Sequence, residues 1–404
     1  MLYAMLSHNG AFPIIALLFA AALALLAGRL RARWLAVPVW VLAGFAALFC
    51  AAGLYGSWRI HSITAATPAP GEMVDVGGYR MHILAEGASP LGAAPVIWIA
   101  GQHSAGFALK HLHDGIKADY RSILFDRPGA GWSEAGPFPR RTALEAAELH
   151  TLLERAGERG PFVVVGHSYG GLLAVNFARR YPEQVAALVL LDATPPDSLV
   201  YGGFDGLAMV SRLGMLQALA RSVGVQSDLL DVMASRNPRA ADQYLPVKEA
   251  LGENLALINR AEAGPKAGWA TASIFSEGAH PQVLDTAFDL VVYDGELGDM
   301  PVYVVLPGTL QSLDWDDDEA VTAFQAATGM PAADLSRFAH ISEAMRYRFL
   351  QVSSAARLLR APAGTGHLFP YETPGFVIDL VRQAVASPVP ADDAVGGANA
   401  PQRR

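Results

Sequence analysis

The sequence predicts an α/β fold: a mostly parallel, doubly wound sheet of about eight strands with an inserted helical lid, preceded by two transmembrane helices. Three observations carry this prediction. Short apolar runs end in Gly-rich loops and alternate with helix-period segments, which is typical of a parallel sheet covered on both faces. An interval of about a hundred residues holds helical patterns and few strand signals. Two long segments at the front carry no charged residue.

Composition and charge exclude one class of partner. The chain has 404 residues, a formal net charge of −8 and a pI near 5.8, so it offers no basic face for nucleic acid. Its mean hydropathy of +0.26, with 52% hydrophobic residues, is high for a soluble enzyme. The single cysteine, Cys50, falls in an apolar run and cannot form an internal disulfide.

Residues 1–58 are expected to form two transmembrane helices joined by a short basic loop. The runs Ala11–Gly28 and Trp34–Trp58 carry no charge, and each is long enough to cross a hydrocarbon core of about 30 Å. Between them lies the basic segment Arg29–Arg33. Because short basic loops stay in the cytoplasm, the expected location is a multi-pass membrane protein whose catalytic domain faces the non-cytoplasmic side, with the lipid bilayer as a partner.

Two other interpretations of this region stay open. A cleaved signal peptide would need a basic start and a shorter apolar stretch, and the first run has no basic start. Buried helices of a soluble core are the other alternative, although two such runs flanking an Arg cluster are unusual there.

After the membrane segments, residues 59–72 are predicted to be a linker, because they include Pro68 and Pro70. Residues 73–192 and 299–387 are predicted to form the catalytic core. A hairpin around Gly77-Gly78 opens it. The predicted strands are Met73–Val76, Tyr79–Leu84, Pro95–Ala100, Ser122–Phe125, Val163–Val165, Val185–Leu191, Pro301–Leu306 and Ala356–Arg360.

The remaining segments are helical or irregular. Residues 193–298 are predicted to form a helical lid over the strand ends, since a structureless loop of that length is improbable. Further helices are expected at Thr142–Ala156, around 319–327 and 341–352, and at Pro374–Ala386. The polar tail, 388–404, is expected to be disordered.

The stretch Pro161–Tyr181 is the centre of the prediction. A β-branched run leads into Gly166-His167-Ser168-Tyr169-Gly170, and a helix-period segment follows. A serine at such a sharp turn needs neighbours without side chains two positions before and after it, and Gly166 and Gly170 supply them. The helix N-terminus beside the hydroxyl favours negative charge. We therefore predict Ser168 to be a nucleophile; the alternative is a Gly-rich turn whose serine caps the helix.

With these residues in view, the chain resembles the α/β-hydrolase family, and GHSYGG is a common form of that family's nucleophile turn. The resemblance implies the fold predicted above and a lid in the interval where the helical patterns lie. It also implies a histidine after the last strand and an acid between the serine and the histidine.

A serine hydroxyl needs a base within hydrogen-bond reach. Of the eleven histidines, His367 follows the last strand's carboxyl end in a Gly-bracketed loop, and it matches the place of the family's histidine. The acid that would orient this histidine has two candidates, because the position where the commonest family pattern places it holds Gln311. Asp192, at the end of the preceding strand, and Asp314, from a longer turn, are equal candidates, with Asp316 behind them.

The carbonyl oxygen of the substrate needs fixed donors for its developing negative charge. The backbone N–H of Tyr169 is one expected donor. By resemblance, the second is the backbone of Gln102 in the segment Ala100-Gly101-Gln102. The loop Asp126–Ser133 also resembles a family loop beside the site, and we expect it to have a packing role.

No cofactor and no metal site is expected. His111, His113 and Asp114 face different ways at their helical spacing and are expected to be solvated or capping residues. The acidic turn that begins at Asp314 fails as a calcium loop, because Glu319 and Gln325 stand where such a loop needs glycine and an acid.

Together these patterns predict a membrane-anchored serine hydrolase that cleaves an ester-like or amide-like bond of a small molecule through an acyl-enzyme on Ser168. Peptidase, esterase, lactonase and acyl transferase activities all remain open, and a noncatalytic membrane-tethered binding module is the alternative from another class. Apolar lid residues hint at a substrate with an apolar group, although such residues more often pack a lid onto the body; they are Leu207, Met209, Leu213, Met215 and Leu216.

Overall fold

The structure is a computed structural model. It describes residues 6, 8, 10–102, 104–138, 140–195, 204–225, 238–276, 294–308, 322, 344 and 346–386. The predicted tail, the acidic turn with Asp314 and Asp316, and the helix expected around 319–327 lie outside the described residues, apart from residue 322.

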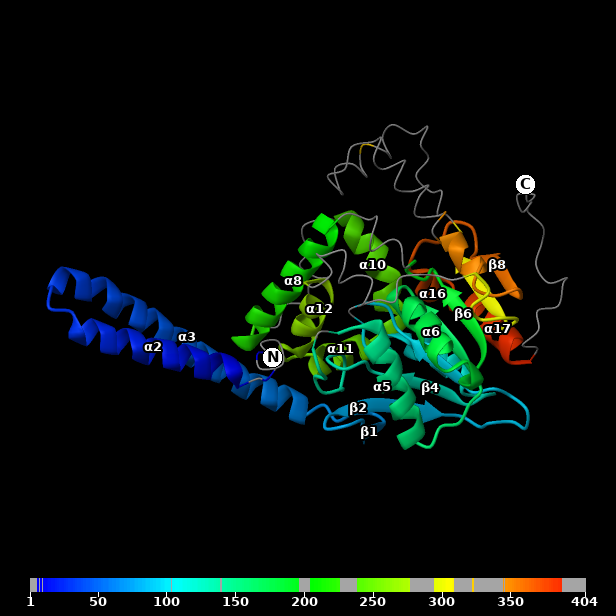
Figure 1. Cartoon of the computed structure of the whole chain (residues 1–404), viewed down its shortest axis with the longest axis horizontal. Coiled ribbons are helices and arrows are strands. Elements are labelled where there is room, and N and C mark those ends of the chain that lie inside the picture. The colour runs from blue at the N-terminus through cyan, green and yellow to red at the C-terminus, as the bar shows by residue number, and fades with distance from the viewer. Residues whose placement is uncertain are drawn as a thin grey trace.

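An eight-stranded sheet forms the centre of the body of the protein, in the order β1-β2-β4-β3-β5-β6-β7-β8 (Figure 1). The pairs β1–β2 and β2–β4 are antiparallel, and all other neighbours are parallel. The strands are β1 (Glu72–Asp75), β2 (Arg80–Glu86), β3 (Val96–Ile99), β4 (Ser122–Phe125), β5 (Phe162–His167), β6 (Val185–Leu191), β7 (Val302–Leu306) and β8 (Ala356–Arg360). The predicted mostly parallel sheet and its opening hairpin are confirmed.

Helices cover both faces of this sheet. On one face, α5 (Thr142–Arg155) and α6 (Tyr169–Arg180) pack with strand residues such as Val164 in one buried cluster. On the other, α4 (Lys110–Ile116) and α17 (Pro374–Ala386) pack with residues such as Val165. Because successive strand side chains point to opposite faces, a fully apolar strand is buried on both sides, as the apolar runs indicate.

Two apolar helices, α2 (Ala11–Arg29) and α3 (Arg33–Ala65), form a hairpin that projects from the body (Figure 1). Both are long and apolar enough to cross a membrane, a criterion that core helices and signal sequences also meet. Only 17% of each apolar window is buried, however, and large side chains such as Leu18 and Trp34 are exposed. This exposure sets the pair apart from helices of a soluble core.

Helix α3 continues to Ala65, so the first part of the predicted linker 59–72 is helical. Ile60 in this last part is fully buried. The hydroxyl of Ser62 donates to the carbonyl of Trp58, and that of Thr64 donates to the carbonyl of Ile60. Packing and these local bonds extend the helix beyond the apolar run on which its predicted end was based.

Four helices are described between β6 and β7: α8 (Phe204–Ser222), α10 (Pro238–Leu251), α11 (Glu253–Ala261) and α12 (Lys266–Ser276). The described part of the predicted lid is therefore helical. Helices α8 and α12 approach closely at Gly214 and Gly268, where a Cβ on either residue would lie within 2.8 Å of the other's carbonyl oxygen. Lys266 ties α12 to the body, since its Nζ donates to the carbonyls of Gly131 and Ser133, each at 2.7 Å.

Candidate active site

Ser168 occupies a strained turn between β5 and α6. Its φ of 56° and ψ of −124° lie in a region that residues with a Cβ rarely adopt. A Cβ at Gly166 would lie 2.4 Å from the carbonyl oxygen of Gly170, and one at Gly170 would lie 2.2 Å from that of Ile99. The turn is held on both sides, because the Ser168 N–H donates to Leu191 O and its carbonyl accepts from Thr194 N. The Ser168 side chain thus starts from the carboxyl edge of the sheet, as a nucleophile requires.

Asp192 and His367 meet at this edge. Asp192 follows the last residue of β6, has a φ of 40° and is 2% exposed. His367 lies in the loop between β8 and α16 (Phe369–Glu372). The distance from Asp192 Oδ2 to His367 Nδ1 is 2.5 Å. The structure therefore brings one of the two candidate acids to the candidate base, while the other candidate, Asp314, lies outside the described residues.

Arg346 is a second partner of Asp192, and no sequence pattern predicted this pairing. Its Nε donates to Asp192 Oδ1 at 2.5 Å. Burial alone would raise the pKa of Asp192, but the hydrogen bond from His367 and the charge of Arg346 outweigh it, so this pKa lies below its ordinary value. The carboxylate is thus held charged with both oxygens occupied. Because Arg346 follows Asp192 by 154 positions, no local pattern indicated the pairing.

His167 also belongs to the site and was not singled out by sequence. Its ring is buried, with Nε2 3.0 Å from the carbonyl oxygen of His367. Burial, followed by the charge of the neighbouring His367, lowers the pKa of His167 to about 4. A neutral imidazole that donates from Nε2 to this carbonyl holds the backbone of His367 against the nucleophile turn. The one sequence feature that could have pointed to His167 is its position directly before Ser168.

The predicted oxyanion segment passes beside Ser168. A Cβ at Gly101 would lie 3.3 Å from the Cβ of Ser168. Gln102 follows directly, and its side-chain Oε1 is buried with no hydrogen-bond partner among the described residues. Tyr169 is the first residue of α6, so its N–H has no acceptor within the helix. Both predicted donors therefore flank the Ser168 turn.

Arg127 contacts both Gly101, which precedes Gln102, and Tyr169. Its Nη2 donates to the carbonyl of Gly101 at 2.6 Å, and its guanidinium lies 4.9 Å from the ring centroid of Tyr169. The Tyr169 hydroxyl in turn donates to Glu145 at 3.2 Å. A single buried cation thus positions the Gly101 loop and the first side chain of α6.

The rest of the Asp126–Ser133 loop is held by Asp126. This fully buried carboxylate accepts from the backbone N–H groups of Gly106 and Trp132 and contacts His82 Nδ1 at 2.9 Å. These contacts fit the packing role expected for the loop, with Arg127 as the residue that reaches the site.

His113 is buried, so the expectation of a solvated or capping residue is wrong for it. Its Nδ1 lies 2.8 Å from Ser122 Oγ and its Nε2 lies 2.9 Å from Glu86. Glu86, His113 and Asp114 present ligand atoms within 4.8 Å of one another. The ammonium of Lys117, however, lies 2.9 Å from both carboxylates. Lysine thus supplies the cation, and the group is an ion-pair network.

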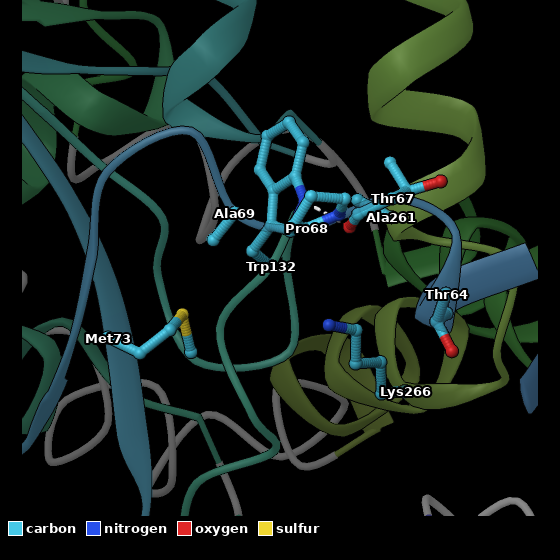
Figure 2. A pocket seen from close by; sticks show the side chains of 8 residues that line it. All are labelled: Thr64, Thr67, Pro68, Ala69, Met73, Trp132, Ala261 and Lys266. Atoms are coloured by element: carbon cyan, nitrogen blue, oxygen red, sulfur yellow. Dashed lines mark hydrogen bonds between the residues drawn. The ribbon is translucent and has the colours of Figure 1, made fainter.

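A pocket of about 230 Å³ lies where α3 enters the body, as Figure 2 shows. Trp132 closes it by donating from Nε1 to the carbonyl of Thr67. The Lys266 side chain enters it from α12. It is lined by Thr64, Thr67, Pro68, Ala69, Met73, Trp132, Ala261 and Lys266. No predicted catalytic residue lines this pocket, which belongs to the junction of the hairpin with the body.

Comparison with known families and curated proteins gives partial matches. The family model described as alpha/beta hydrolase fold matches residues 99–235. An uncharacterized protein YbdG of Bacillus subtilis is 24% identical over 156 residues, which is 38% of this chain and 47% of that protein. The lipase LipV of Mycobacterium tuberculosis is 59% identical over 44 residues, 11% of this chain and 16% of the lipase. The chain thus spans less than half the length of these two relatives.

Among solved structures, an epoxide hydrolase from Bacillus megaterium superimposes with a TM-score of 0.53 at 14% identity. The match covers 78% of this chain and all of that protein. At this identity the likeness concerns the fold alone.

Proposed function

Because the chain belongs to the α/β-hydrolase fold family, we propose that it is a membrane-anchored serine hydrolase that cleaves an ester-like or amide-like bond. The observation that carries the proposal is the 2.5 Å contact between Asp192 Oδ2 and His367 Nδ1, at the sheet edge where Ser168 occupies a strained turn. A carboxylate on Nδ1 fixes the tautomer whose Nε2 accepts a proton.

In the proposed reaction, His367 takes the proton of the Ser168 hydroxyl as the serine oxygen attacks the substrate carbonyl. Negative charge moves to the carbonyl oxygen, where the backbone N–H groups of Gln102 and Tyr169 stabilise it. His367 then gives its proton to the leaving alcohol or amine as the bond breaks. Water, deprotonated by His367, attacks the acyl-enzyme, and the acid product leaves with Ser168 restored.

Asp192 stabilises the imidazolium form of His367 at each proton transfer. Because Arg346 occupies its other oxygen, the carboxylate is fixed in one orientation. The name of the similar lipase supports an ester as the substrate class, and no cofactor or metal is needed for any of these steps.

The test is covalent labelling with a fluorophosphonate, which reacts with activated serines. The full chain in detergent is expected to take up one label. A Ser168→Ala variant is expected to take up none. A Ser354→Ala variant, which alters an exposed serine away from the site, serves as its matched control and is expected to label normally. A folded wild-type chain that takes no label would support the noncatalytic binding module instead.

Membrane anchoring is proposed from the exposed apolar surface of α2 and α3, and the side from the arginines of the turn between them. A phosphatase reporter that works only outside the cytoplasm, fused after Arg404, is expected to be active. Replacing Arg29, Arg31 and Arg33 together with Gln is expected to weaken this preference. A reporter active only in the cytoplasm would reverse the orientation.

A further inference from the structure

Over residues 211–222, helix α8 exposes three large apolar side chains and buries three polar ones, whereas an ordinary surface helix buries its apolar side. Between Ser211 and Ser222, its buried positions include Ser211, Arg221 and Ser222, each 6% exposed or less. The opposite stripe is formed by Met215, Leu216 and Leu219, at 38%, 62% and 40% exposure, and Val225 follows at 49%. We call these four residues the α8 apolar face.

This arrangement corrects the packing expectation for Met215 and Leu216; Leu213 is half-buried, and the side chains of Leu207 and Met209 lie outside the described residues. Small residues of α8 make its contact with α12: Gly214 meets Gly268, and Ala218 packs with Trp269 and Ala272. The larger side chains are left on the outside. Met215, Leu216 and Leu219 lie within two turns of one helix. An exposed apolar patch of this kind is typical of an interaction surface.

The end of α8 lies against the N-terminal hairpin. Gly224, just after the helix, contacts Gly56, where a Cβ would lie 2.4 Å from the carbonyl oxygen of Ser222. Arg59 Nη1 donates to the carbonyl of Gly224 at 2.8 Å. Just before α2, Leu6 packs against the cluster of Ala218 and Trp269. The start of the first helix and the end of the second, which together form the base of the hairpin, are therefore both tied to α8 or α12.

On α3, the residues that contact the end of α8 lie near the end of the apolar run Trp34–Trp58. A Cβ on Gly224 would lie 3.5 Å from the ring of Tyr55. Tyr55 and Trp58 are 53% and 65% exposed. Such aromatic rings are typical of the membrane–water interface. Val225 and the exposed part of α8 thus continue the hairpin's apolar surface at the level where the helices would leave a bilayer.

The direction of α8 relative to the hairpin is also compatible with contact along a membrane surface. In Figure 1, α8 runs steeply across the axis of the α2–α3 hairpin and forms the edge of the body nearest to it. A bilayer crossed by the hairpin would therefore lie along α8 rather than meet it end-on. Arg212, one turn before Met215 on the exposed side, suits the headgroup layer.

We propose that the α8 apolar face lies in the interfacial layer of the bilayer that the hairpin spans. This inference rests on the membrane anchoring in the proposed function. Its occupant is a lipid surface, and the interface is continuous with Tyr55 and Trp58. The hairpin and the inserted helix together would hold the catalytic domain in a fixed orientation to the membrane, with the helical insertion as its lipid-facing side.

The test uses the full chain in proteoliposomes, in a Cys50→Ala background. Single substitutions Leu216→Cys and Leu219→Cys carry an environment-sensitive fluorophore, and shallow doxyl lipids act as quenchers. Leu245→Cys on α10 is the matched control, because Leu245 is 51% exposed and α10 packs on α16 and α4. Leu54→Cys, 60% exposed on α3, reports the hairpin. Each labelled variant is first shown to melt like wild type.

The labels at 216 and 219 are expected to be quenched at least about twofold, because an interfacial helix face lies about 5–10 Å deep in the headgroup boundary. The label at 245 is expected to be unaffected. If 54 is quenched while 216 and 219 behave like 245, the hairpin crosses the membrane but the α8 proposal is wrong. If 54 is not quenched either, the anchoring itself fails, and the α8 proposal with it.

Discussion

Replacing Ser168 with alanine is expected to lower kcat/KM toward an activated ester by on the order of 10⁵-fold or more, because no other group in the site would form the acyl intermediate. KM is expected to change little, since the hydroxyl contributes to the transition state more than to ground-state binding. The measurement is steady-state hydrolysis of a p-nitrophenyl ester series by the full chain in detergent.

The backbone strain at Ser168 provides an independent check on this variant. Alanine carries a Cβ as serine does, so the turn at φ 56° costs both residues about the same. The thermal midpoint should therefore stay near that of wild type. A Ser168→Ala chain that melts normally yet keeps more than a tenth of the activity would remove Ser168 from the reaction.

Replacing Asp192 with asparagine is expected to reduce kcat about 10⁴-fold, as losing the acid of such a triad does elsewhere. An amide in this place leaves the tautomer of His367 unfixed and its protonated form without a counter-charge. It also removes the negative charge that faces the Nε of Arg346, so some loss of stability is expected as well. Activity is therefore compared at a temperature where both proteins are folded, as judged by circular dichroism.

Asp314→Asn is the matched control, because sequence alone gave Asp192 and Asp314 equal standing as the acid. The contact between Asp192 and His367 predicts that Asp314→Asn keeps nearly all of its activity. The reverse ranking would assign the acid to Asp314 and leave Asp192 as a partner of Arg346. Equal, small losses in both variants would mean that neither carboxylate orients the base.

Most strands could be predicted closely because they are short runs of aliphatic or β-branched residues, several of them bounded by glycine or proline. The strand Val185–Leu191 and the helix Pro374–Ala386 have the bounds that the sequence predicted. Periodicity and turn residues act locally, so the information lies within the segment itself. The end of α3 at Ala65 was missed because it depends on the burial of Ile60, which is a tertiary contact.

In the candidate site, too, the features set by local sequence could be predicted and those set by tertiary contacts could not. The strained turn at Ser168 could be predicted because it requires Gly166 and Gly170 within five residues. Arg346, Arg127 and the buried ring of His113 could not, since each acts through partners brought together by the fold. The packing role expected for Met215 and Leu216 was wrong, because composition does not distinguish a stripe that faces the body from one that faces away.

The most direct measurement is the location of the covalent intermediate. The full chain is mixed with a p-nitrophenyl ester, quenched in acid within one turnover, digested with trypsin and analysed by mass spectrometry. The account predicts the acyl mass on the peptide spanning residues 160–179, at Ser168 and at no other residue. An active protein that carries the acyl group elsewhere, or that turns over without any acyl adduct, would contradict it.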